Sequence, residues 1–264
     1  MQKCLVKVNL MQEVTNKIDI NKVNDIIEKA KSENRSILDV AESKDILKAS
    51  GITVNKFDVA KSSEEARKLA DEIGCPVVMK IVSTDPKLLH KTDMGGVVVG
   101  IPTPEKAAQT FEEIMARINE KAPGASMEGI MVEEMAEGVE IIIGTTMDPT
   151  FGPLIMTGLG GIFVEVLKDV SFRVIPITEY DAREMIDEIK AKKILEGVRG
   201  KPPVNKDAIV KTLLLISELI MNVSWEQDGK AKQQLPIIRE IDINPLFANE
   251  KEVIAVDCRV ILKE

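Results

Sequence analysis

The chain has 264 residues, a formal net charge of −8 at pH 7, and a composition that is 44% hydrophobic and 30% charged. This composition excludes a disordered chain, and the length suffices for one large domain or two modest ones. The acidic balance, with only 3% aromatic residues, disfavours a non-specific binder of nucleic acid or anionic membranes, because such binders need a positive surface.

The three cysteines are far apart in the sequence and form no CxxC pair, so neither a zinc site nor a disulfide framework is indicated. The sequence contains no apolar run of signal-peptide or transmembrane length. Together these features predict a cytoplasmic protein with free thiols and with no membrane or nucleic-acid partner.

Hydrophobic periodicity and punctuation by glycine and proline predict the elements of the first half of the chain. We expect helices over 21–32, 40–50, 62–73 and 103–122, and strands over 52–54, 76–82 and 97–99. Gly51 and Gly74 are placed to end helices, and Pro104 stands at a first helical position.

The second half is richer in strands. We expect strands over 130–134, 139–145, 154–156, 237–243 and 253–256, helices around 179–195 and 206–222, and a polar loop over 227–234. The pattern predicts an α/β protein, but paired strands outnumber strict β-α-β repeats. That argues against a TIM barrel and against a simple Rossmann sheet.

Lys80 interrupts the otherwise apolar run 76–82. A lysine within a buried strand either extends its amine to the surface or meets an anion, because an unpaired buried charge is costly. The sequence window alone leaves both interpretations open.

His90 is the only histidine of the chain and precedes a glycine pair, Gly95 and Gly96. Glycines let backbone N–H groups approach phosphate oxygens, although such a pair is also common in turns. A lone histidine is usually a surface or core residue, but an imidazole is also a nucleophile toward phosphorus. Its place between Lys80 and the glycine pair strengthens the second interpretation, and the residues alone leave both open.

Alternation along a strand puts Glu240, Asp242 and Asn244 on one face, and Asp257 follows a second apolar run. Carboxylate and amide oxygens are ligands typical of Mg²⁺. A solvated edge strand is the alternative, but the flanking residues are too apolar to favour it.

Further acidic residues, Glu133, Glu134 and Glu140, are embedded in apolar strands and therefore need partners. A glycine-rich segment, 158–165, is compatible with either a tight corner or an anion site.

Taken in order, the segments 76–82, 89–97, 158–165, 195–203 and 240–246 resemble the ATP-grasp subunit of ADP-forming acyl-CoA synthetases. Within that family, the beta subunit of ADP-forming acetate–CoA ligase is the most similar. The beta subunit of succinyl-CoA synthetase is a more distant relative.

The resemblance implies an ATP-grasp fold in which two α+β subdomains grip a nucleotide between them. The first 35 residues are then an N-terminal extension with a helix, and residues 36–264 form the ATP-grasp domain, with subdomains at about 55–130 and 131–264.

The same resemblance assigns roles to individual residues. His90 relays phosphate as a phosphohistidine, and Asp242, Asn244 and Asp257 hold Mg²⁺. The residues implied to bind ATP or ADP are Lys80, Gly95, Gly96, Glu133, Glu134, Met135 and Glu140.

The implied reaction is acyl-CoA + ADP + phosphate ⇌ carboxylic acid + CoA + ATP. It requires a CoA-binding alpha subunit as partner, in an expected α2β2 assembly, because this chain has no CoA-type Rossmann fingerprint. Two alternatives remain open at this point: a succinyl-CoA synthetase-like subunit, and a non-catalytic subunit that senses nucleotide.

Overall fold

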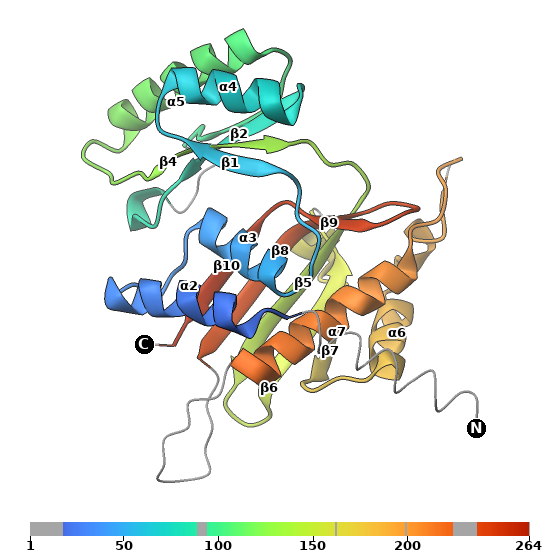
Figure 1. Ribbon diagram of the computed structural model, residues 1–264. Helices are drawn as coiled ribbons and strands as arrows, with labels where there is room; N and C mark the ends of the chain where they lie inside the picture. The colour runs from blue at the N-terminus through green and yellow to red at the C-terminus, as the bar shows by residue number, and fades with distance from the viewer. Residues whose placement is uncertain (1–17, 89–93, 162, 199, 224–236, 264) are drawn as a thin grey trace. The chain divides into compact units, whose positions relative to one another are not determined.

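The computed structural model describes residues 18–88, 94–161, 163–198, 200–223 and 237–263. The chain divides into two compact units (Figure 1). The small unit contains residues 39–41 and 55–136, and the large unit contains residues 1–38, 42–54 and 137–264 as far as these are described. Each unit is considered by itself below.

The small unit is a four-stranded sheet with strand order β1-β4-β2-β3 and two helices. All its strand pairs are antiparallel. Its elements are β1 (Phe57–Ala60), α4 (Ser63–Ile73), β2 (Val77–Val82), the short 3₁₀ turn η1 (Pro86–Leu88), β3 (Val97–Ile101), α5 (Pro104–Lys121) and β4 (Gly129–Glu134).

Both long helices of the small unit begin at a side-chain cap. The hydroxyl of Ser62 accepts a hydrogen bond from the backbone N–H of Glu65, and that of Thr103 accepts one from Lys106. Alternation along β4 puts Ile130 and Val132 into the core that α4 and α5 share with the sheet. The intervening β4 residues therefore project from the face opposite these helices.

The large unit is built on a six-stranded antiparallel sheet with the order β10-β8-β5-β6-β7, in which β9 also pairs with β8. Its strands are β5 (Val139–Asp148), β6 (Gly152–Leu159), β7 (Val170–Val174), β8 (Ile238–Ala248), β9 (Val253–Ala255) and β10 (Cys258–Leu262). Its helical elements are α2 (Ile20–Ser32), α3 (Val40–Ala49, of which the first two residues group with the small unit), η2 (Phe163–Leu167), α6 (Glu179–Glu188), η3 (Lys192–Ile194) and α7 (Lys206–Val223).

One face of the large sheet is covered by helices, and apolar residues of β5, β6 and β8 join α2, α3, α6 and α7 in a single core (Figure 1). Segments from opposite ends of the chain meet at its edge strand β10. The N–H of Leu38 donates to the carbonyl of Val260, and the N–H of Leu262 donates to the carbonyl of Ser36. The large unit is thus closed by the first and last described parts of the sequence.

The structure differs from the sequence prediction in several elements. The helix expected to reach residue 195 ends at Glu188, because Ile189 is extended and the Asp169 carboxylate accepts hydrogen bonds from the N–H groups of Lys190 and Ala191. Strands β1, β7 and β10 were not expected. The strand expected at 52–54 is reduced to one bridge between Val54 and Ala255.

The division into units also departs from the expected boundaries. Residue 130, expected to end the first subdomain, lies inside β4, which belongs wholly to the small sheet. The helix expected in the first 35 residues is α2, and it packs into the core of the large unit. The loop expected at 227–234 lies outside the described residues. Within the described ranges, no helix has both the length and the apolar character needed to cross a membrane.

Candidate functional site

Lys80 lies in a buried ion pair in the small unit. Its Nζ is 2.9 Å from Oε1 of Glu133, and the two side chains are only 5% and 4% exposed. Lys80 on β2 is paired with Met131, two residues before Glu133 on β4, so both side chains project from the sheet face opposite α4 and α5. The amine therefore does not extend to solvent, which rules out one of the two interpretations left open by the sequence.

Asn55, just before β1, extends this arrangement to a third strand. Its amide Nδ2 donates to Oε2 of Glu133 at 3.2 Å and to the backbone carbonyl of Glu134 at 2.7 Å. Asn55 is itself buried. A buried carboxylate thus contacts a cation at one oxygen and an amide at the other, as a buried charge requires.

The glycine pair lies beside Lys80. Val97 of β3 pairs with Lys80, and the carbonyl of Gly96 accepts a hydrogen bond from the N–H of Ile81 at 2.9 Å. Gly95 has a φ of +70°, and its carbonyl accepts a hydrogen bond from the guanidinium of Arg117 on α5. A Cβ at Gly95 would stand 2.6 Å from Cδ of Arg117, so this close approach requires glycine.

The segment 133–135, expected to bind ATP or ADP, begins at Glu133, whose side chain is directed at Lys80. Glu134 continues the pairing with the chain before β1, because its N–H donates to the carbonyl of Lys56 at 2.9 Å. Met135 is half-buried just after β4. His90 lies outside the described residues.

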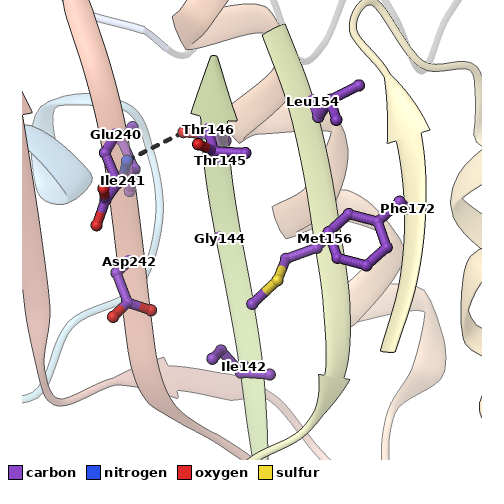
Figure 2. Close-up of a pocket in the computed structure, with 10 residues that line it drawn as sticks. All are labelled: Ile142, Gly144, Thr145, Thr146, Leu154, Met156, Phe172, Glu240, Ile241 and Asp242. Atoms are coloured by element: carbon purple, nitrogen blue, oxygen red, sulfur yellow. Dashed lines mark hydrogen bonds between the residues drawn. The ribbon is translucent and has the colours of Figure 1, made fainter. Parts of the chain in front are cut away.

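In the large unit, Asp242 lies on the sheet face opposite the helices. It pairs with Gly144 of β5 and Arg259 of β10, and it lines a cavity of about 230 Å³ on this face. Figure 2 shows its carboxylate beside Gly144, with Met156 and Phe172 further along the cavity. Glu240 lies on the same face, as the strand alternation predicts.

The electrostatic environment of Asp242 disfavours its charge. Burial raises the pKa of Asp242, while the nearby cation of Arg259 opposes this shift. The negative charges of Glu240 and Asp257 raise the pKa of Asp242 further, so each of them lies near enough to repel the Asp242 carboxylate. Asp257 itself accepts a hydrogen bond from the N–H of Cys258 at 3.0 Å.

Glu140 and Asn244 meet at the glycine-rich turn. The N–H of Gly160 donates to the carbonyl of Glu140 at 2.7 Å. A Cβ at Gly160 would lie 3.2 Å from Cβ of Glu140 and 3.3 Å from Oδ1 of Asn244, and a Cβ at Gly161 would lie 2.5 Å from Oε2 of Glu140. The absence of side chains at 160 and 161 therefore leaves room for the polar groups of Glu140 and Asn244.

The donors fit a hard cation. Asp242, Asn244 and Asp257 each have a side-chain oxygen that can serve as a ligand, and a divalent cation would relieve the repulsion that Asp242 experiences. Among the described residues, no group of three or more His, Cys, Asp or Glu is placed to hold a metal. This finding leaves the expected set undecided, because that set contains two carboxylates and one amide.

Two residues of this arrangement were not singled out from the sequence. Asn55 precedes a strand that was itself not expected, and Arg117 lies in an amphipathic helix in which a charged residue is ordinary. Neither has a local pattern that marks it, since each acts on a residue at least 22 positions away.

Comparison with known proteins gives one consistent family. The ATP-grasp domain family matches residues 29–262. The chain is 50% identical over 244 residues to the beta subunit of acetate–CoA ligase [ADP-forming] I of Pyrococcus furiosus, which covers 92% of this chain and 99% of the relative. By contrast, it is 27% identical to the beta subunit of succinate–CoA ligase [ADP-forming] of Methanothermobacter thermautotrophicus, covering 82% of this chain and 54% of that one.

Solved structures of acetyl-coenzyme A synthetases match the chain as well. The dinucleotide-forming acetyl-coenzyme A synthetase 1 of Ca. Korarchaeum cryptofilum, in complex with coenzyme A, Ca-AMPCP and HgCl⁺, matches with a TM-score of 0.82 and 42% identity, covering 90% of this chain and 99% of that chain. The same enzyme with coenzyme A and Mg-AMPPCP, its phosphohistidine segment pointing towards the nucleotide-binding site, matches with a TM-score of 0.75 and 38% identity, covering 91% and 100%. Both confirm the expected fold class.

Proposed function

Because the chain belongs to the ATP-grasp family of ADP-forming acetate–CoA ligase beta subunits, we propose that it transfers a phosphoryl group between a phosphohistidine and ADP. With its partner, the reaction is acyl-CoA + ADP + phosphate ⇌ carboxylic acid + CoA + ATP. The 50% identity to an acetate–CoA ligase beta subunit, against 27% to a succinate–CoA ligase one, favours acetate over succinate chemistry.

The observation that carries this proposal is the buried ion pair of Lys80 and Glu133. Glu133 orients the ammonium inside a sheet, where a charge-assisted hydrogen bond to phosphate is stronger than in water. Gly95 and Gly96 lie next to Lys80, where backbone N–H groups can approach phosphate oxygens. Lys80 and the glycine pair therefore bind nucleotide phosphate in this proposal.

Residues 133–135 contact the nucleotide base, and Glu140 also binds the nucleotide. Asp242, Asn244 and Asp257 hold Mg²⁺, which when bound neutralises phosphate charge and so assists the transfer. Asn244 and Glu140 approach each other at the turn formed by Gly160 and Gly161, which leaves room for a ligand at these two side chains.

His90 carries the phosphoryl group. It is the only histidine in the 264 residues, so a phosphohistidine on this chain must form there. In the forward step, an ADP β-phosphate oxygen forms a bond to phosphorus while the bond from the imidazole nitrogen breaks, which yields ATP and a neutral histidine. The partner in this proposal is a CoA-binding alpha subunit in an α2β2 assembly in the cytoplasm.

The remaining alternative is a subunit that senses nucleotide without catalysis. The presence of lysine, histidine and oxygen ligands together disfavours it, because a sensor has no need for the histidine. The test that separates the two is phosphorylation of the chain itself.

The experiment incubates the purified chain, with and without its alpha subunit, with Mg²⁺ and ATP labelled at the γ-phosphate. The expected result is label on this chain that is acid-labile and alkali-stable, because a phosphoramidate hydrolyses once its imidazole is protonated. His90→Ala removes the label and ATP synthesis but leaves ADP binding intact, since Lys80 is unchanged. Label that persists on the His90→Ala chain, or wild-type protein that takes no label with its partner present, overturns the proposal.

A further inference from the structure

Asn55 contacts Glu133, which is the partner of the lysine that is proposed above to bind phosphate. It lies two residues before Phe57, which pairs with Glu133, so Asn55, Glu133 and Lys80 come from three adjacent strand segments of the small unit. All three side chains are more than nine-tenths buried. Buried polar groups of this kind act as a network, because each depends on its neighbours for hydrogen bonds.

The contacts form a chain from Asn55 through Glu133 to Lys80. Asn55 donates to Oε2 of Glu133 at 3.2 Å, and Oε1 of the same carboxylate is 2.9 Å from Nζ of Lys80. The same Asn55 amide also donates a hydrogen bond to the backbone carbonyl of Glu134 at 2.7 Å. With its two amide hydrogens used in this way, Asn55 ties the orientation of the Glu133 carboxylate to the backbone of β4.

A carboxylate fixed at one oxygen has fewer rotamers available, and the cation bound to its other oxygen is held more precisely. If Asn55 is shortened, the Glu133 carboxylate can rotate and Lys80 loses a fixed partner. Ordering Lys80 then costs free energy at the moment when a ligand binds.

We infer that Asn55 is a positioning residue. It fixes the Glu133 carboxylate, and the fixed carboxylate aligns Lys80 for nucleotide phosphate. This inference rests on the proposed function, in which Lys80 binds the phosphate. Asn55 itself does not touch the nucleotide in this arrangement, so its effect on binding passes through Lys80.

A double-mutant cycle on the full-length chain tests the inference, with ADP affinity measured by calorimetry. Asn55→Ala should weaken ADP binding by about three- to tenfold when Lys80 is present. In the Lys80→Met background, the same change should alter affinity less than twofold. In the coupled assay with the alpha subunit, KM for ADP should rise more than kcat falls.

Asn222→Ala is the matched control. Asn222 also donates its amide to a carboxylate, that of Glu218 at 2.6 Å, but at the exposed surface of α7. Its removal should leave ADP affinity unchanged. Thermal melting without nucleotide shows whether each variant is folded, and Asn55→Ser replaces Asn55→Ala if the alanine variant does not fold.

The outcomes distinguish failure of the positioning role of Asn55 from failure of the proposed role of Lys80. Equal weakening by Asn55→Ala in both backgrounds, or no weakening when Lys80 is present, overturns the positioning role alone. If Lys80→Met by itself changes ADP affinity less than twofold, the proposed role of Lys80 fails and the inference fails with it. A lower melting temperature with unchanged ADP affinity shows that Asn55 is purely structural.

Discussion

Replacing Glu133 with glutamine should destabilise the small unit far more than the same change at the surface. Glu133→Gln keeps the shape of the side chain but removes the negative charge that faces Lys80 at 2.9 Å. Its amide oxygen can still accept from Lys80, but the amide nitrogen then faces Asn55, which is itself a donor at that position. The variant therefore lacks the negative charge that faces Lys80, and it places two donors opposite each other.

The size of the effect follows from burial. Removing one partner of a buried ion pair costs about 3–5 kcal/mol, because the remaining charge stays desolvated. Lys106 and Glu113 on α5 form a pair of almost the same length, 2.8 Å, but with side chains 43% and 52% exposed. An exposed pair contributes about 0–1 kcal/mol, so Glu113→Gln is the exposed control for the same substitution in an ion pair of similar length.

Hydrogen exchange of peptides from β2 and β4 measures the opening free energy of this unit without a contribution from the other. We expect it to fall by about 3–5 kcal/mol in Glu133→Gln and by less than about 1 kcal/mol in Glu113→Gln. Adding Lys80→Met to Glu133→Gln should recover part of the loss, because the cation that faced Glu133 is then also removed. A loss in Glu133→Gln as small as that in the control would refute the view that the buried charge pair organises this site.

Two further predictions concern the large unit. Asp257→Ala or Asn244→Ala should weaken the Mg²⁺ dependence of ADP binding in titrations with and without the metal. Asp58→Ala is the control and should leave this dependence unchanged. Like Asp257, Asp58 accepts a hydrogen bond from the N–H of the residue that follows it. Unchanged Mg²⁺ dependence in both site variants would contradict the metal assignment. Hydrogen bonding to Arg173 lowers the pKa of Glu188 from 4.5 to about 2, so this contact stabilises the folded state above about pH 4.5 and is lost as the pH falls through 2. Urea denaturation of Glu188→Gln should therefore show a constant deficit from pH 7 to about 5 that shrinks towards pH 2; a deficit independent of pH would exclude the ionised pair as its cause.

The sequence predicted those parts of the fold in which local pattern and tertiary environment agree. The apolar run around Lys80 forms β2, and Glu240 and Asp242 share a face of β8 as alternation requires. The fold class and the family were confirmed by comparison. The roles of His90 and of the individual site residues remain predictions.

The parts that could not be predicted depend on distant partners. Strand β7 presents Phe172 and Val174 to solvent and turns Arg173 towards Glu188 of α6, so its apolar residues are on the less buried side. Nothing local in this segment indicates which face is covered. The partner of Glu133 at position 55 is likewise 78 residues away, and only the strand order β1-β4-β2 brings the two together.

The closing of the large unit by both ends of the chain has a consequence for how the protein folds during synthesis. The small unit is almost continuous in sequence, so its sheet can form once residue 136 has left the ribosome. In contrast, Leu38 and Ser43 hydrogen-bond to the backbone of β10, and Val260 of β10 lies 217 residues after Ser43 in the sequence. The segment that contains α2 and α3 therefore remains without its β10 partners until β10 has been synthesised, and apolar residues such as Ile27 and Leu47 are available to chaperones and to aggregation during that time.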